Sequence, residues 1–217
     1  MKVFVVGATG MAGSAFVKAA VKQGIAVVAN GRSEEKLTQL KEEVPQIEVL
    51  AKDAFTLTKE DFAGCAAVLD AFATTPNKAY LQTDLAAHLV HLLRENSKIR
   101  LGVILGAGSL TTGSDHHLVV KDFEKDPTTK SWRATPQNQY KEYQFLQNVD
   151  NVDWFGVSPA LSFIPGKKTA KILSGDNELL YNDHHESVTT AGTMAAALVD
   201  ELITPKHHQT RFTVANG

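Results

Sequence analysis

Three glycines near the start of the chain stand at a spacing that suits phosphate binding. Gly7, Gly10 and Gly13 form the pattern G-x-x-G-x-x-G, directly after an apolar run at residues 2–6 and directly before a helical pattern. Glycine lets the backbone turn sharply and approach a pyrophosphate closely, and the first N–H groups of the next helix favour an anion. This order of strand, glycine loop and helix predicts a dinucleotide site rather than a turn without a ligand.

The residues after the second predicted strand indicate which dinucleotide to expect. The apolar run at 25–29 is followed by Arg32 and Ser33, and the first acid is Glu34. Proteins that prefer NAD place an acid here for the ribose hydroxyls, whereas those that prefer NADP place a cation. Arg32 and Ser33 could bind a 2′-phosphate, which favours NADPH. The alternative is that Ser33 only caps the next helix and Arg32 is solvated.

Other residues are candidates for the cofactor site because they follow predicted strands. Asp53 could accept a hydrogen bond from the adenine amino group, or it could be an ordinary loop aspartate. Small and polar residues after the strand at 66–72 leave room for a cofactor backbone. The residues expected to bind the cofactor are Gly7, Thr9, Gly10, Met11, Gly13, Arg32, Ser33, Asp53, Phe72, Ala73, Thr74, Gly106 and Gly108.

The candidates for catalysis lie in the second half of the chain. Gly106 and Gly108 follow the predicted strand at 99–105, at the end where open α/β sheets bind ligands. Ser109 is therefore the first candidate for a hydroxyl that faces substrate or nicotinamide, with a turn serine as the alternative. Tyr140 and Trp132 are candidate stacking surfaces, although ordinary core or lid packing explains each of them as well.

Strand and helix patterns alternate along most of the chain, which predicts an α/β fold with a doubly wound parallel sheet. We expect one domain over residues 1–217, with a small annex on the substrate side at 160–187. A long loop or lid is expected at 111–136, and a small hairpin from 171–173 and 179–181. The expected strands are 2–6, 25–29, 47–50, 66–72, 99–105, 152–157 and 211–214, and the main helices are 11–23, 34–43, 77–96, 137–149 and 189–202.

Composition excludes several other classes of protein. The 217 residues are 43% hydrophobic and carry a net charge of −2, which does not favour a nucleic-acid surface. The single cysteine, Cys65, cannot form an internal disulfide and is expected to be buried and inert. His88, His91 and Glu95 have metal-like spacing, but a solvated helix flank explains them better, so no metal is expected. No leader or membrane span is recognised, and we expect a cytoplasmic monomer or homodimer.

Several motifs in a fixed order carry a resemblance to a known family. They are residues 6–14 (VGATGMAGS), 106–110 (GAGSL), 153–160 (DWFGVSPA), 165–166 (PG), 197–202 (ALVDEL) and 211–214 (RFTV). Together they cover nearly the whole chain. On these motifs the chain resembles the atypical short-chain dehydrogenase/reductase-like proteins described as NADH-flavin reductases, which are similar to NmrA-like and biliverdin reductase B-like proteins.

The resemblance implies a Rossmann NAD(P)-binding fold and an NAD(P)H-dependent oxidoreductase that passes hydride to a small-molecule acceptor. That acceptor is a flavin, FMN or FAD, or a similar planar molecule. The usual Tyr-x-x-x-Lys pair is missing, because Gln144 follows Tyr140 and Gln147 follows Tyr143. Its absence weakens carbonyl reduction and disfavours a sugar-nucleotide epimerase, but it does not weaken flavin reduction. The alternative is an NmrA-like regulatory protein that senses NADP without turnover.

A second departure from the family concerns the last predicted helix. Such families commonly carry an Asp near the start of that helix, and this chain has Thr193 there. The usual cap of the helix is therefore in doubt.

Overall fold

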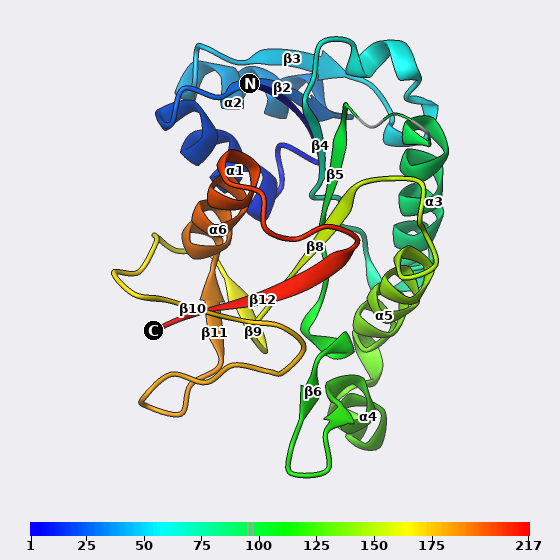
Figure 1. Cartoon of the computed structure of the whole chain (residues 1–217), viewed down its shortest axis with the longest axis vertical. Coiled ribbons are helices and arrows are strands. Elements are labelled where there is room, and N and C mark those ends of the chain that lie inside the picture. Colours follow the sequence, from blue (N-terminus) through cyan, green and yellow to red (C-terminus); the bar gives the residue numbers. More distant parts are fainter. Residues whose placement is uncertain (95, 97) are drawn as a thin grey trace.

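Short apolar runs form the strands of one central sheet in the computed structural model, which describes residues 1–94, 96 and 98–217 (Figure 1). In the central strands β1, β4 and β8 the side chains are buried on both faces, as a parallel sheet requires, whereas the edge strands are partly exposed. Eight strands pair in the order β10-β12-β8-β5-β4-β1-β2-β3 within the described residues. They are β1 (Lys2–Val6), β2 (Ala26–Gly31), β3 (Glu48–Ala51), β4 (Ala67–Asp70), β5 (Arg100–Ile104), β8 (Trp154–Pro159), β12 (Thr210–Asn216) and β10 (Ile172–Gly175).

The sheet reverses its winding direction at β1, as in other doubly wound folds. Val3 pairs with Val27 of β2 on one side and with Ala67 of β4 on the other. All neighbouring strands are parallel except β10, which pairs antiparallel with β12 at one edge. The predicted α/β fold with a parallel doubly wound sheet is confirmed. Ligands in such folds bind beside the carboxyl ends of the strands at this reversal.

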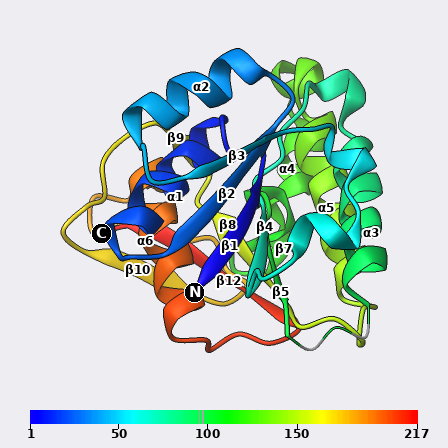
Figure 2. The ribbon, with the colours of Figure 1, turned by 90° about the horizontal axis from the view of Figure 1, so that it is seen from above.

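Helices cover both faces of the sheet (Figures 1 and 2). On one face α1 (Met11–Lys22), α2 (Glu34–Glu43) and α6 (Ala191–Ile203) bury Phe16, Leu37 and Leu198 against the strands. On the other face α3 (Leu81–Leu93) and α5 (Ala134–Leu146) pack side by side with buried leucines between them and the sheet. None of these helices is long and apolar enough to cross a membrane.

Two local predictions, for residues 111–136 and for residues 171–181, were wrong. Residues 111–136 do not form a loop: they contain a small hairpin, β6 (Thr111–Thr112) and β7 (His117–Leu118), followed by α4 (Val119–Lys125). The expected hairpin of 171–173 with 179–181 is absent, because β10 pairs with β12 instead.

The expected helix at 77–96 is shorter than predicted. It is split into a 3₁₀ turn at Pro76–Lys78 and α3. Part of that range, Glu95, lies outside the described residues.

The predicted annex at 160–187 is divided between two structures. β9 (Ser162–Ile164) pairs with β11 (Val188–Thr190) in a separate two-stranded sheet, whereas β10 belongs to the central sheet. Thr193 replaces the family's helix-start acid in a hydroxyl network. The Thr190 hydroxyl accepts from the Thr193 N–H, and the Thr193 hydroxyl accepts from the Thr169 N–H. The start of α6 is thus capped by threonine instead of aspartate.

Candidate functional site

Backbone geometry requires glycine at two of the three positions of the first loop, Gly7 and Gly13. Gly7 has a φ of +71°, and a Cβ on it would lie 2.7 Å from the Ala71 carbonyl oxygen. A Cβ on Gly13 would lie 2.9 Å from the Cα of Ala8, so α1 could not approach β1 as closely. Gly10 is the N-cap of α1 and offers no side-chain cap to its N–H groups. These N–H groups can therefore meet an anion, so the loop fits a pyrophosphate.

A cavity of about 610 Å³ extends from this loop along the ends of β1, β2 and β3, and we call it the nucleotide cavity. Of the predicted cofactor residues, it is lined by Gly7, Thr9, Gly10, Arg32, Asp53, Phe72, Ala73 and Thr74. Sequence analysis therefore identified eight of its lining residues, whereas others, such as Asn30, Lys52 and Phe55, were not predicted.

Within the described part of the chain, four cationic side chains line the nucleotide cavity. Arg32, Lys36 and Lys78 line it and are exposed to solvent. Lys52 also lines it, but its Nζ lies 2.6 Å from an oxygen of Asp61. Of these three exposed cations, the sequence analysis had identified only Arg32. Lys36 was missed because a lysine in the first turn of a helix is usually an ordinary solvated side chain.

The side chains of two polar residues near this cavity accept hydrogen bonds from backbone N–H groups. The Ser33 hydroxyl accepts a hydrogen bond from the Lys36 N–H at 3.3 Å and caps α2, and Ser33 is not part of the lining. Asp53 lines the cavity, and its Oδ1 accepts from the Phe55 N–H at 3.0 Å. The capping interpretation holds for Ser33, whereas Asp53 keeps one carboxylate oxygen for a ligand.

A second cavity, of about 590 Å³, lies beyond the ends of β4, β5 and β8, and we call it the substrate cavity. It shares Gly10 and residues 71–74 with the nucleotide cavity, so the two adjoin at the glycine loop. Met11, Gly106 and Gly108, which were predicted to bind the cofactor, line this second cavity instead of the nucleotide cavity. Its aromatic walls are Phe72, Phe123, Trp132 and Phe163.

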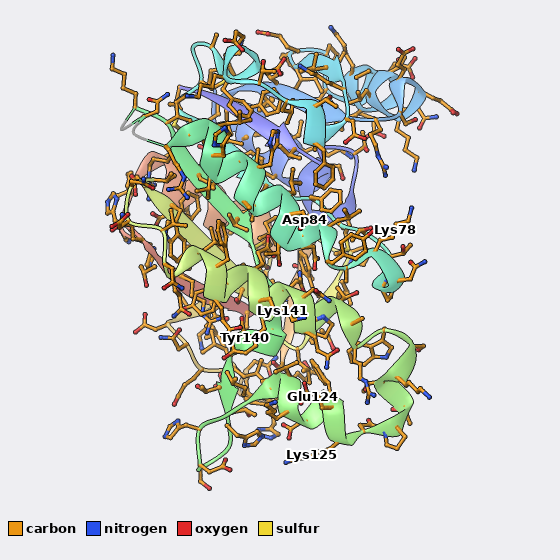
Figure 3. All side chains as sticks on the ribbon, turned by 90° about the vertical axis from the view of Figure 1, so that its right-hand side faces the viewer. Lys78, Asp84, Glu124, Lys125, Tyr140 and Lys141 are labelled. Atoms are coloured by element: carbon orange, nitrogen blue, oxygen red, sulfur yellow. The ribbon has the colours of Figure 1, made fainter. Side chains whose placement is uncertain are left out.

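Ser109 does not line either cavity. It is 2% exposed, and its hydroxyl donates to the Gly106 carbonyl oxygen at 3.1 Å and accepts from the Arg211 guanidinium. Its side chain holds the 106–109 turn together, so the structure supports the turn-serine alternative. Tyr140 is half-buried on α5 and lines neither cavity. Figure 3 shows it on α5 beside Lys141.

Arg211 is a buried cation that sequence analysis missed. It is 3% exposed, stacks 4.2 Å from the centre of the Tyr143 ring, and donates to Ser158, Asn177 and the Ser109 carbonyl oxygen. Burial lowers the pKa of this guanidinium. These neutral partners tie β12 to the turn that forms one wall of the substrate cavity. A single arginine in a strand carries no sequence signal of such burial.

Two buried carboxyl groups, Asp70 at the end of β4 and Glu142 on α5, influence one another. Burial raises the pKa of Asp70 to about 6, although the Phe72 N–H opposes this by donating to Oδ1. Burial, and then the charge of Asp70, raise the pKa of Glu142 well above its ordinary value. Burial thus favours the neutral form of both carboxyl groups, and the charge of Asp70 adds to this effect at Glu142.

Gln82 of α3 is a buried amide in the lining of the substrate cavity. It is 4% exposed, and its Oε1 has no hydrogen-bond partner in the described structure. A buried amide oxygen without a partner is costly. Glutamine on an otherwise apolar helix face gave no recognisable signal in the sequence.

The metal hypothesis gains no support. No group of three metal-ligating side chains occurs in residues 1–94, 96 and 98–217, and Glu95 falls outside that range. The ring Nε2 of His88 lies 3.1 Å from the Leu57 carbonyl oxygen. Cys65 is buried, as predicted, and burial raises the pKa of its thiol.

A parallel doubly wound sheet, a glycine loop at its reversal point and an uncapped helix N-terminus together define a dinucleotide-binding protein of the Rossmann class. Comparison with known families agrees, because the NAD(P)H-binding family matches residues 7–205. The chain belongs to that NAD(P)H-binding family.

Relatives match along the full length of the chain. The uncharacterised protein YwnB of Bacillus subtilis (strain 168) is 33% identical over all of this chain and 99% of its own length. The crystal structure of a Lactobacillus casei protein is 36% identical, with a TM-score of 0.92 and full coverage of both chains. A Streptococcus pneumoniae TIGR4 protein, which has been proposed to be a NADH-flavin reductase, is 31% identical, with a TM-score of 0.88 and full coverage of both chains.

Proposed function

We propose that this protein is an NADPH-preferring oxidoreductase that passes hydride from the nicotinamide to a flavin or a similar planar acceptor. The observation that carries this proposal is the pair of adjoining cavities. One is rich in cations and lies on the glycine loop, and the other is walled by aromatic rings. A dinucleotide that spans the loop would place its adenosine in the first and its reactive ring at the junction.

The chain's own groups provide binding and orientation. The N–H groups at the start of α1 hold the pyrophosphate, and Arg32 and Lys36 meet the 2′-phosphate. Phe72 lies in the lining of both cavities and offers a ring against which planar groups can stack. The bound cofactor supplies the hydride itself, and the apolar walls exclude water from the transfer.

No acid is placed to protonate a substrate carbonyl. Asp126 is the one titratable side chain among the described residues that line the substrate cavity, and hydrogen bonds from Thr128 lower its pKa. Carbonyl reduction needs a positioned proton donor, whereas a reduced flavin can take its second proton from solvent. The similarity to the Streptococcus pneumoniae protein proposed to be a NADH-flavin reductase supports the same acceptor class.

The test is a titration of the purified protein with NADPH and NADH, followed by addition of riboflavin, FMN, FAD or a quinone. We expect tighter binding of NADPH and acceptor-dependent loss of reduced-nicotinamide absorbance. Tight binding without oxidation by any acceptor would favour the alternative, an NADP-sensing regulatory protein. The missing catalytic Tyr-Lys pair keeps this alternative open. Failure to bind either nucleotide would contradict both functions.

A further inference from the structure

The two adjoining cavities differ sharply in charge. Four cationic side chains line the nucleotide cavity: Arg32, Lys36, Lys52 and Lys78. Among the described residues that line the substrate cavity there is no lysine, arginine or histidine, and its one charged side chain is Asp126. The cationic side chains that can bind phosphate therefore line the nucleotide cavity and not the substrate cavity.

Asp126 makes the mouth of the substrate cavity negative. Its carboxylate is fixed, because Oδ1 accepts from both the N–H and the hydroxyl of Thr128 at 2.8 Å. These hydrogen bonds lower the pKa of Asp126, so the group is ionised at neutral pH. A phosphate that entered or crossed this mouth would meet a like charge and no compensating cation in the lining.

Three exposed apolar side chains also belong to the lining of the substrate cavity. Met11, Trp132 and Leu161 line the substrate cavity and are 38%, 43% and 46% exposed. The Trp132 ring is held edge-on against Phe123, with ring centres 5.0 Å apart. Exposed apolar side chains gathered around a cavity mark a surface that a ligand covers. A flat, largely apolar molecule matches them.

Neutral amides supply the polar contacts inside. Gln139 lines the cavity beside Gly106, and the buried Gln82 has an Oε1 without a partner. An amide can both donate and accept, so it suits a ring edge that carries N–H and C=O groups side by side. Such an edge is neutral, which agrees with the absence of cations from the lining.

We infer that the substrate cavity selects an uncharged planar acceptor without a phosphate, and so takes riboflavin in preference to FMN or FAD. This inference rests on the proposed function. In the reaction, the C4–H bond of the nicotinamide breaks and its hydride reduces N5 of the isoalloxazine. One proton from solvent completes the dihydroflavin, and NADPH leaves as NADP⁺. Riboflavin and FMN share this ring system, so their comparison isolates the phosphate.

The first experiment measures kcat/KM for riboflavin, FMN and FAD at saturating NADPH. We expect riboflavin to exceed FMN at least fivefold at low ionic strength, and the ratio to shrink as salt screens Asp126. Equal or better turnover of FMN would overturn the inference, because a cation outside the lining would then reach the phosphate.

Variants at the mouth test the cause of the preference. Leu161→Lys brings a cation to an exposed position, and Leu161→Gln is its neutral control. We expect Leu161→Lys to raise the FMN-to-riboflavin ratio of kcat/KM about fivefold or more, and Leu161→Gln to leave that ratio unchanged. Asp126→Asn keeps Oδ1 for the Thr128 contacts and should raise the same ratio. If neither Leu161→Lys nor Asp126→Asn changes the ratio, charge does not set the preference.

A binding measurement separates this inference from the proposed function. Quenching of flavin fluorescence is followed on titration with protein in saturating NADP⁺, which fills the nucleotide cavity. Tighter binding of riboflavin than of FMN without any turnover would contradict the oxidoreductase proposal and still support the cavity's selectivity. Turnover with equal affinity for the two flavins would support the oxidoreductase and contradict the selectivity.

Discussion

Arg32 is an exposed side chain in the lining of the nucleotide cavity, and Lys36 belongs to the same lining. Its planar guanidinium can bind two phosphate oxygens through two parallel N–H groups, a fork that an ammonium group does not have. The 2′-phosphate is the one feature of NADPH that NADH lacks. The proposed preference for NADPH would therefore depend on a few exposed side chains.

Replacing Arg32 with Ala should weaken NADPH binding about tenfold or more and leave NADH binding within about twofold, because a charged hydrogen bond contributes roughly 1.5–3 kcal/mol. Isothermal titration of both nucleotides checks this. Lys36→Ala should act in the same direction with a smaller effect. As a control, Lys41→Ala on the exposed face of α2 removes a cation that does not line the cavity. Equal losses for NADPH and NADH on Arg32→Ala would contradict the 2′-phosphate role.

The buried pair of Asp70 and Glu142 gives a prediction about pH. Burial raises the folded-state pKa of both groups, so the folded chain binds more protons than the unfolded chain above about pH 4. Stability must then fall as pH rises through the folded-state pKa of Asp70, about 6, and beyond. Glu142→Gln removes one of the two titrating groups and should flatten this fall.

Urea unfolding between pH 5 and pH 8 measures the effect. We expect Glu142→Gln to be more stable than the parent by roughly 1–3 kcal/mol at pH 8, and the difference to diminish at pH 5. Glu42→Gln, at an exposed position of α2, is the matched control and should follow the parent at every pH. Identical pH slopes for Glu142→Gln and the parent would show that burial does not perturb this pair.

At the scale of elements, the turn at 106–109 depends on a strand that lies far away in the sequence. Arg211 of β12 donates to the hydroxyl and the carbonyl oxygen of Ser109, and Ser158 of β8 donates to the Gly106 carbonyl oxygen. A Cβ on Gly108 would lie 2.8 Å from the Cβ of Pro136, so α5 packs directly on the turn. One wall of the substrate cavity is thus fixed by β12 and α5 together.

Arg211→Lys should loosen this wall, because one ammonium group cannot reach Ser109, Ser158 and Asn177 together. We expect the free energy of unfolding to fall by about 1–3 kcal/mol and KM for the acceptor to rise severalfold. Affinity for NADPH should stay close to that of the parent, since Arg211 does not line the nucleotide cavity. Urea unfolding and steady-state kinetics provide the two readouts. A loss of NADPH affinity with an unchanged KM for the acceptor would contradict the role of Arg211 in supporting the substrate cavity.

Sequence patterns predicted the elements that follow a local rule. The apolar runs predicted where the main strands lie along the chain, and the spacing of Gly7, Gly10 and Gly13 predicted a nucleotide site. Both patterns depend only on residues that are close together in the sequence. The hairpin predicted at 171–181 was wrong because β10 pairs with β12, about 40 residues further along. Ser109 was predicted to face a ligand because the sequence does not reveal that Arg211 occupies its hydroxyl. Contacts between distant elements determine these outcomes.

For the whole molecule, nucleotide binding should appear as a gain in stability. A ligand that binds only the folded state at 100 times its dissociation constant adds about 2.7 kcal/mol to the free energy of unfolding. For a chain of this size, that gain corresponds to a rise in Tm of roughly 5–11 °C. Differential scanning fluorimetry with NADPH measures the shift. NADH at the same concentration should give a smaller one, and equal shifts would contradict the NADPH preference.

The order of strands in the sheet has a kinetic consequence. β1, which leads into the glycine loop, pairs Val5 with Leu69, and β5 pairs Val103 with Gly156. Long stretches of chain must close into loops before such pairs form, so this sheet is expected to assemble slowly. Both cavities open beside the ends of these strands and exist only when the pairing is complete. A nucleotide therefore cannot hasten folding; it lengthens the lifetime of the native state by slowing unfolding.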